Sequence, residues 1–347
     1  MASVLILGAG VMGSALSVPA ADNSHAVRLV GTPLDREIIR ELKRAGGVHP
    51  KLDTPLPANV EPLDIAELEP RHFAEADHVV IGVSSPGIDW ATARLAEMMT
   101  APRPVAFVTK GLVAVDAGVE TYAETIPRAL ALLPRASFIG VGGPCIAREL
   151  ANRWPTASVY ACSNPGRAAH FAGLMQTRYY RLSVSDDVTG VEACAALKNF
   201  FAIGVSAVQT RYPDTVRTGA QAKNPTAAAF NQAAREMALI SERMGGRRDT
   251  AFDLAGIGDL HVTAGGGRNS KLGHGLGLGA TVSEIMKGDL AGETVEGIDT
   301  AQALAGWVRL VGRREPDDNA LPLASAIIDA VLEDRPFDFD FQRIGLA

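Results

Sequence analysis

Short apolar runs, many of them β-branched, recur through the first half of the chain, and stretches with helical periodicity separate them. A parallel strand covered on both faces has such a continuous apolar run, and strands that alternate with helices predict βαβ units with right-handed crossovers. We therefore expect a doubly wound parallel α/β sheet in this half. The expected strands are residues 4–7, 27–30, 78–83, 105–109 and 137–141, and the clearest helices between them are 38–44 and 91–99.

The pattern changes close to residue 188. Two further strand candidates, 157–161 and 179–184, precede this point, and mostly helical periodicity follows it. We expect a first domain of residues 1–187 and an all-helical second domain of residues 188–347. Glycine-dense stretches at 265–267 and 273–279 predict loops within the second domain. The helices expected there are 191–208, 227–243, 250–255, 281–287, 300–310 and 321–332.

Composition places the chain among ordinary globular proteins. Of its 347 residues, 47% are hydrophobic and 21% are charged, which opposes disorder, and the length suits two domains with sizeable cores. The net charge of −6 argues against a broad nucleic-acid-binding surface, but it allows a small basic pocket for an anionic metabolite. We therefore expect a small-molecule ligand and no nucleic-acid partner.

The cysteines and histidines predict neither a disulfide framework nor a metal site. Cys145, Cys162 and Cys194 are an odd number at wide spacing, so a reducing cytoplasm is the simplest compartment. The seven histidines have no ligand spacing, and we expect no metal. The first apolar run stops at Gly8, which is too early for a signal peptide or a membrane span, and we expect neither.

A glycine pattern follows the first predicted strand. Gly8, Gly10 and Gly13 form G-x-G-x-x-G, with Val11 and Met12 inside it, where a strand gives way to a helix. The first glycine allows a tight turn, the second lets a pyrophosphate approach the backbone, and the third lets helix and strand pack closely. The helix N-terminus would then present N–H groups to the phosphates. This placement predicts a dinucleotide site.

The sequence leaves the choice between NAD and NADP open. A carboxylate at the end of the second strand usually binds the ribose, and residues 30–33, Val-Gly-Thr-Pro, contain none. Asp35 suits a ribose hydroxyl, whereas Arg36 suits the 2′-phosphate of NADP.

Lys198 is the sharpest candidate for chemistry. It lies with Asn199 in residues 193–203, a stretch of the predicted helix that is otherwise apolar on every side, and such a stretch is buried. A buried lysine either pairs with an acid or loses its proton more readily than usual. Lys198 is therefore either a general acid/base or half of a structural ion pair.

Other candidates lie where ligands are commonly bound. Lys110 follows a predicted strand at the carboxyl edge of the sheet, and Gly143 ends another. In the second domain, Asp259 could hold Lys198 or cap the next helix. Arg268 and Asn269 follow three glycines, a composition that suits a phosphate or, alternatively, a solvated loop.

The motifs together resemble the NAD(P)-dependent glycerol-3-phosphate dehydrogenases over nearly the whole chain. That resemblance implies a Rossmann-type sheet followed by an all-helical C-terminal domain. It also implies reversible hydride transfer between NAD(P)H and dihydroxyacetone phosphate, which gives sn-glycerol 3-phosphate for glycerophospholipid synthesis, and a homodimer. The motifs are GAGVMG at 8–13, VTKG at 108–111, GGPCIARE at 142–149, GVEACAALKNFFAI at 190–203, GIGDL at 256–260, GRNSKLG at 267–273 and VEGIDTA at 295–301.

The resemblance also assigns roles by position. It implies that Lys198 is the catalytic acid/base, with Lys110 and Asp259 beside it. Gly143, Arg268 and Asn269 would contact the phosphorylated substrate. The positions implied to touch the dinucleotide are Gly8, Gly10, Val11, Met12, Gly13, Lys110, Ala147, Arg268, Thr294 and Glu296.

Departures from the family pattern keep alternatives open. Cys145 stands where the family usually has a hydroxyl or amide side chain, residues 259–268 form a shortened segment, and residues 209–223 resemble an insertion. A related dehydrogenase of another phosphorylated polyol or hydroxy acid is the first alternative. A non-catalytic dinucleotide-binding protein is the second, although a binding protein needs no proton donor.

Overall fold

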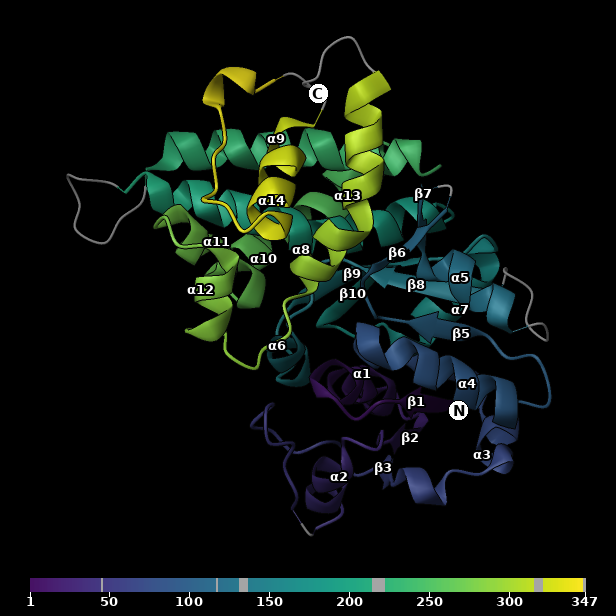
Figure 1. Cartoon of the computed structure of the whole chain (residues 1–347). Coiled ribbons are helices and arrows are strands. Elements are labelled where there is room, and N and C mark those ends of the chain that lie inside the picture. Colours follow the sequence, from purple (N-terminus) through teal and green to yellow (C-terminus); the bar gives the residue numbers. More distant parts are fainter. Residues whose placement is uncertain (45, 117, 131–136, 214–221, 315–320, 346–347) are drawn as a thin grey trace. The chain divides into compact units, whose positions relative to one another are not determined.

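The structure is a computed structural model that describes residues 1–44, 46–116, 118–130, 137–213, 222–314 and 321–345. The chain divides into two compact units. Unit 1 comprises Met1–Lys110 and Ala123–Val191, and unit 2 comprises Gly111–Tyr122 and Glu192–Ala347. In Figure 1, unit 1 runs from purple to teal, and unit 2 is mainly green and yellow.

Unit 1 is built on an eight-stranded sheet in the order β10-β9-β8-β5-β4-β1-β2-β3. Neighbouring strands are parallel except β8 and β9, so β9 and β10 run against the others. The prediction of a doubly wound α/β sheet is confirmed, as a mostly parallel sheet. The strands are β1 (Ser3–Leu7), β2 (Ala26–Val30), β3 (Val60–Leu63), β4 (His78–Ile81), β5 (Val105–Phe107), β8 (Phe138–Gly142), β9 (Thr156–Ala161) and β10 (Tyr180–Ser185).

The reversal of direction between β8 and β9 was not predicted, and neither was strand β3. Burial on both faces gives an apolar run whichever way a strand points, so the pattern locates β9 and β10 but not their direction. β3 contains Glu61 and Pro62 and lies at the sheet edge, where a strand tolerates a polar residue and a proline.

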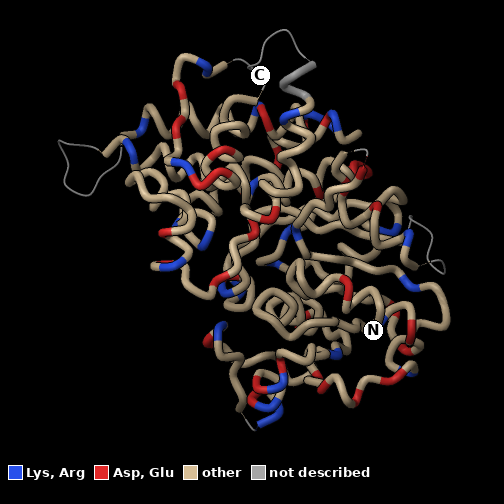
Figure 2. Tube along the Cα trace, in the orientation of Figure 1, with Lys and Arg blue, Asp and Glu red and all other residues tan. Residues whose placement is uncertain are grey.

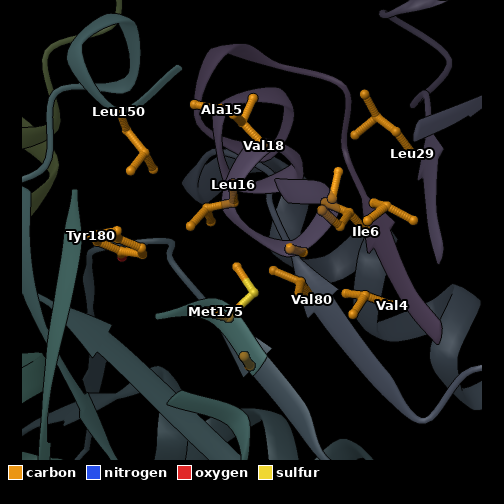
Figure 3. Packing of buried hydrophobic residues seen from close by; sticks show 14 of the residues in the cluster. Val4, Ile6, Ala15, Leu16, Val18, Leu29, Val80, Leu150, Met175 and Tyr180 are labelled. Carbon is orange, nitrogen blue, oxygen red and sulfur yellow. The ribbon is translucent and has the colours of Figure 1, made fainter. Parts of the chain in front are cut away.

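The core of unit 1 lies between the sheet and its helices. Figure 3 shows Ile6 of β1, Leu16 of α1, Val80 of β4 and Met175 of α7 among its members, each at most 2% exposed. Helix α1 is buried from Gly13 to Ala21, which explains why its sequence lacks a polar face. The helices of this part are α1 (Val11–Asp22), α2 (Arg36–Leu42), α3 (Pro70–Glu75), α4 (Ile88–Met98), α5 (Tyr122–Ala129), α6 (Ala147–Ala151) and α7 (Pro165–Met175).

Unit 2 is mainly helical, as expected, and contains one hairpin that was not predicted. Strands β6 (Leu112–Val115) and β7 (Gly118–Thr121) pair antiparallel and pack against α13. The helices are α8 (Val188–Arg211), α9 (Lys223–Arg243), α10 (Asp259–Ala264), α11 (Arg268–Gly277), α12 (Val282–Lys287), α13 (Glu296–Arg314) and α14 (Pro322–Leu332).

The expectation of a loop at residues 273–279 is wrong, because α11 continues to Gly277. Its glycines allow close packing: a Cβ on Gly273 would lie 2.2 Å from the carbonyl oxygen of Ile203, and one on Gly277 would lie 2.4 Å from that of Ala207. Both oxygens belong to α8. The glycines therefore bring the backbones of two helices together, which outweighs the low helix propensity of glycine.

Helix α8 is the central element of unit 2. It is long and apolar enough to cross a membrane by length and composition, but its most apolar 18-residue window is 100% buried within the protein. Burial accounts for that composition. The segment 209–223, which resembled an insertion, begins within the last turn of α8 and ends at the first residue of α9; its residues 214–221 lie outside the described part. The Ala222 N–H donates to the Tyr212 carbonyl (2.9 Å).

A buried carboxylate joins α9 to α14. Glu236, which is 0% exposed, accepts hydrogen bonds from the N–H groups of Leu323 and Ala324 in the first turn of α14, both at 2.8 Å, and from Gln232 at 2.9 Å. Burial raises the pKa of Glu236 to about 7. The N–H groups that begin α14 thus find acceptors inside the core.

Positions of basic residues (blue) and acidic residues (red) are interspersed along the trace of each unit in Figure 2. A broad basic surface of the kind that binds nucleic acid would gather one sign.

Candidate active site

The glycine loop of unit 1 has the geometry that a pyrophosphate site needs. Gly8 has φ +109°, and its N–H donates to the Val30 carbonyl (2.8 Å), which ties the start of the loop to the end of β2. A Cβ on Gly13 would lie 2.1 Å from the Gly8 oxygen, whereas one on Gly10 would meet nothing within 4 Å. Gly8 and Gly13 thus serve the turn and the packing, and the open surroundings of Gly10 fit a dinucleotide phosphate.

Asp35, the N-cap residue of α2, supports the glycine loop. Its Oδ2 accepts hydrogen bonds from the N–H of Thr32 (2.8 Å) and the N–H of Ala9 (3.2 Å). Arg36 is exposed beside it. The sequence suggested Asp35 as a ribose ligand; the structure places it first in contact with the backbone of the glycine loop.

Lys110 and Gly143 lie at the same edge of the sheet as the glycine loop. Strands β1, β4, β5 and β8 are mutually parallel, so their carboxyl ends meet at one edge. Gly8 follows β1, Lys110 comes three residues after β5, and Gly143 follows β8 with φ +108°. Ala147 begins α6 a few residues later and is 9% exposed.

Unit 2 contains a buried ion pair formed by the two residues that the sequence singled out. Lys198 is 9% exposed and Asp259 is 2% exposed. The Lys198 Nζ donates to Asp259 Oδ1 (3.0 Å) and to Thr263 Oγ1 (2.8 Å). A buried ammonium is tolerated when a carboxylate and further hydrogen bonds compensate for the lost water.

A π-helical turn positions Asp259. Residues Leu254–Gly258 form this turn, and α10 begins at Asp259 directly after it. A Cβ on Gly256 would lie 2.0 Å from the Ala251 carbonyl oxygen, so the turn requires glycine there. Thr263 lies one helical turn after Asp259 and donates its hydroxyl to the Asp259 carbonyl (2.8 Å). This bond leaves the Thr263 oxygen oriented to accept from Lys198.

Asn269 connects α11, α8 and α13. Its Nδ2 donates to Asn199 Oδ1 (3.0 Å), and its Oδ1 accepts from the Gly297 N–H (2.9 Å). Asn269 and Asn199 are 5% and 6% exposed. Asn199 is the neighbour of Lys198 in α8, so α10 binds one of these two adjacent polar residues and α11 binds the other.

Arg268 forms ion pairs at the start of α11. Its guanidinium donates to the Glu296 carboxylate, and Nη1 lies 3.8 Å from Glu293 Oε2. The Arg268 side chain is 41% exposed. Thr294, which lies between Glu293 and Glu296 in the sequence, is also exposed. The predicted residues of unit 2 therefore form one buried pair, Lys198 with Asp259, and one accessible pair, Arg268 with Glu296.

Sequence reasoning missed the role of Thr263 and the partner of Asn199. A signal existed for Thr263, because a residue four positions after Asp259 faces the same side of a helix. No local signal joins Asn199 to Asn269, since they lie 70 residues apart. Among the described residues, no group of three or more His, Cys, Asp and Glu could hold a metal ion.

Comparisons with known proteins show which family the chain resembles. Family models match both parts of the chain: the N-terminus of NAD-dependent glycerol-3-phosphate dehydrogenase at residues 3–168 and its C-terminus at residues 187–338. The chain is 37% identical to an NADP(+)-dependent glycerol-3-phosphate dehydrogenase of Archaeoglobus fulgidus over 82% of each chain. It is 32% identical to a glycerol-3-phosphate dehydrogenase [NAD(P)+] of Alkalilimnicola ehrlichii, over 86% of this chain and 85% of the relative.

A solved structure shares the fold. The glycerol-3-phosphate dehydrogenase of Coxiella burnetii matches with a TM-score of 0.78 and 24% identity over 96% of both chains. Together with the two family models, which cover most of both units, these relatives establish that the chain belongs to the NAD-dependent glycerol-3-phosphate dehydrogenase family.

Proposed function

We propose that the chain reduces dihydroxyacetone phosphate to sn-glycerol 3-phosphate with NADH or NADPH, reversibly, and that Lys198 supplies the proton. Residues 1–187 would bind the dinucleotide, and residues 188–347 would carry the proton donor and the phosphate-binding groups. The observation that carries the proposal is the buried Lys198–Asp259 pair in a chain that also has an open glycine loop.

The reaction needs a cation near the substrate oxygen. The reduced nicotinamide supplies hydride to the carbonyl carbon. The carbonyl oxygen then gains negative charge, which an ammonium group both stabilises and neutralises by giving up a proton. Asp259 and Thr263 fix the position of the Lys198 ammonium, so that it needs little reorganisation when that charge appears.

The remaining candidate residues would hold the two ligands. Gly10 with Val11 and Met12 would take the pyrophosphate at the N-terminus of α1, where no side chain caps the helix. Arg268 and Asn269 would bind the substrate phosphate, because a guanidinium can engage two of its oxygens. Lys110 and Gly143 would contact the substrate, and Ala147, Thr294 and Glu296 the dinucleotide, as the family pattern implies.

Further expectations follow from family membership. We propose a cytoplasmic homodimer that supplies glycerol 3-phosphate for glycerophospholipid synthesis. Size-exclusion chromatography with light scattering tests the dimer. Loss of glycerol 3-phosphate in cells that lack the protein, restored by the parent but not by Lys198→Ala, would support the metabolic role.

A substrate panel tests the reaction. Purified protein should oxidise NADH or NADPH rapidly with dihydroxyacetone phosphate and poorly with dihydroxyacetone, which lacks the phosphate. Comparing the two cofactors at matched concentrations gives the preference. Turnover of a different phosphorylated ketone or keto acid, without turnover of dihydroxyacetone phosphate, would favour the related-dehydrogenase alternative.

A further inference from the structure

His49 is a fully buried histidine that lies outside every motif considered so far. It is 0% exposed and belongs to the segment between α2 and β3. Its Nε2 lies 3.1 Å from the carbonyl oxygen of Ala9, and its Nδ1 accepts the Lys51 N–H at 3.1 Å. Because Nδ1 accepts a hydrogen bond, it carries no proton, and the neutral ring must donate from Nε2 to Ala9.

Ala9 is held from several sides. Its carbonyl oxygen also accepts the Ser14 hydroxyl (3.1 Å), and its N–H donates to Asp35 (3.2 Å). Ala9 itself is 0% exposed. The residue between the first two glycines of the loop is thus fixed by His49, Ser14 and Asp35, which come from three different parts of unit 1.

The carbonyl of Ala9 belongs to the same peptide group as the N–H of Gly10. In a planar trans peptide these two bonds point in opposite directions. Since buried donors hold the carbonyl, the Gly10 N–H faces away from them, and the surroundings of Gly10 are open. A donor fixed in this way is ready to bind an anion without reorganisation.

We propose that His49 is a positioning residue for the dinucleotide: its hydrogen bond to Ala9 orients the Ala9–Gly10 peptide so that the Gly10 N–H binds the pyrophosphate, and protonation of His49 weakens that binding. The proposal rests on the proposed function only in taking the ligand to be a dinucleotide. A protonated ring would place a hydrogen on Nδ1, directly against the Lys51 N–H.

The charged groups around His49 set the direction of the pH effect. Burial lowers the pKa of His49 below its usual 6.5, and Lys51 lowers it further, while the Ala9 carbonyl and Asp35 act in the opposite sense. His49 is therefore neutral at pH 7 and gains a proton only in more acidic solution. Dinucleotide affinity should therefore fall as the pH is lowered below 6.5.

Binding of ADP-ribose tests the proposal, because this probe has the pyrophosphate but no nicotinamide and needs no turnover. Calorimetry from pH 5 to pH 8 would compare the parent with His49→Gln and His49→Leu. The glutamine amide can donate to Ala9 and does not titrate, so His49→Gln should bind nearly as well as the parent and show a flatter pH profile. His49→Leu should bind about tenfold more weakly at pH 7.

His78→Gln is the matched control. His78 is also a buried histidine, 3% exposed, but it begins β4 at the amino end, the edge opposite the glycine loop. Its replacement should leave both the affinity at pH 7 and the acid weakening unchanged. Circular dichroism of each variant reports whether it is folded. Ser14→Ala removes the second hydrogen-bond donor to the Ala9 carbonyl, and its ADP-ribose affinity is measured in the same way.

The outcomes separate this proposal from the proposed function. A folded His49→Leu with parental affinity, or a His49→Gln that keeps the parental acid weakening, would overturn the positioning role. If His49→Leu does not fold, the pH profile of His49→Gln decides. ADP-ribose binding without turnover of dihydroxyacetone phosphate would sink the proposed reaction and leave His49 in place, whereas a parent that binds no ADP-ribose would sink both.

Discussion

At the scale of single residues, the Lys198–Asp259 pair shows how far sequence reasoning reaches. A lysine in an otherwise apolar helix predicts burial and a need for an acidic partner, and the structure provides that partner at 3.0 Å. The third member, Thr263, depends on the π-helical turn that sets where α10 begins. Such a turn has no simple sequence period, so the start of α10 at Asp259 was not predictable, although the four-residue spacing between Asp259 and Thr263 is visible in the sequence.

Arg268 gives a residue-scale prediction about the substrate phosphate. Arg268→Ala should raise the KM for dihydroxyacetone phosphate by roughly 10- to 100-fold with a smaller change in kcat, because a phosphate contact is made before and during the reaction. Steady-state kinetics measures KM and kcat separately. Lys271→Ala, an exposed change in the same helix, is the control. An unchanged KM would remove Arg268 from the phosphate site.

His78 gives a prediction about stability against pH. Burial lowers its pKa from 6.5 to about 4, with a further contribution from His170. Between these values the unfolded chain binds a proton that the folded chain does not, so stability is complete above pH 6.5 and declines as the pH falls towards 4. The loss should reach on the order of 3 kcal/mol.

Thermal unfolding of the parent and of His78→Gln from pH 7 to pH 4.5 measures this loss. The variant should lose less stability over that range, since its side chain does not titrate. Equal acid sensitivity in the two proteins would assign the effect to other groups.

At the scale of elements, apolar periodicity located most strands and helices but not how they pack. It predicted helices at 191–208 and 321–332, close to the observed α8 and α14. It failed at β3, which carries charge and proline at a sheet edge, and at α11, whose glycines suggested a loop. In both cases the tertiary environment outweighs local preference.

The glycines of α11 give a prediction at this scale. Gly273→Ala should destabilise the protein by roughly 1–3 kcal/mol, because its methyl group would collide with the backbone of α8 at Ile203. The control is Gly306→Ala in α13, where a Cβ would meet nothing within 4 Å. That change should be neutral or stabilise by about 0.5–1 kcal/mol.

Denaturant unfolding gives the change in the free energy of unfolding for both variants. It distinguishes a collision between helices from the ordinary gain in helix propensity when glycine is replaced by alanine. Stabilisation by Gly273→Ala similar to that by Gly306→Ala would mean that α8 and α11 do not require this close approach.

At the scale of the whole molecule, the change of pattern near residue 188 separated a sheet-containing part from a helical one. The contacts divide the chain at Val191 and also assign Gly111–Tyr122 to unit 2. That assignment follows from the packing of the β6–β7 hairpin on α13, nearly 200 residues later, which no local pattern reports. The ordered motifs, by contrast, carried the family assignment without knowledge of any contact.

The same motifs name candidate site residues but do not predict the contacts between them. Asp35 and Arg268 illustrate the difference, because the structure shows each bound to protein groups that the sequence did not suggest. Some of these contacts join residues that lie more than 20 positions apart in the sequence. They become visible only when the elements are assembled.

The most direct test of the account is single-turnover reduction of dihydroxyacetone phosphate by the parent and by Lys198→Ala, each saturated with reduced cofactor and followed by nicotinamide absorbance. Cofactor affinity, measured in parallel, should be nearly unchanged, while the rate should fall by roughly 10²- to 10⁴-fold, because the proton donor acts in the transition state. Comparable rates in the two proteins, with both folded and saturated, would contradict the role of Lys198 as the proton donor.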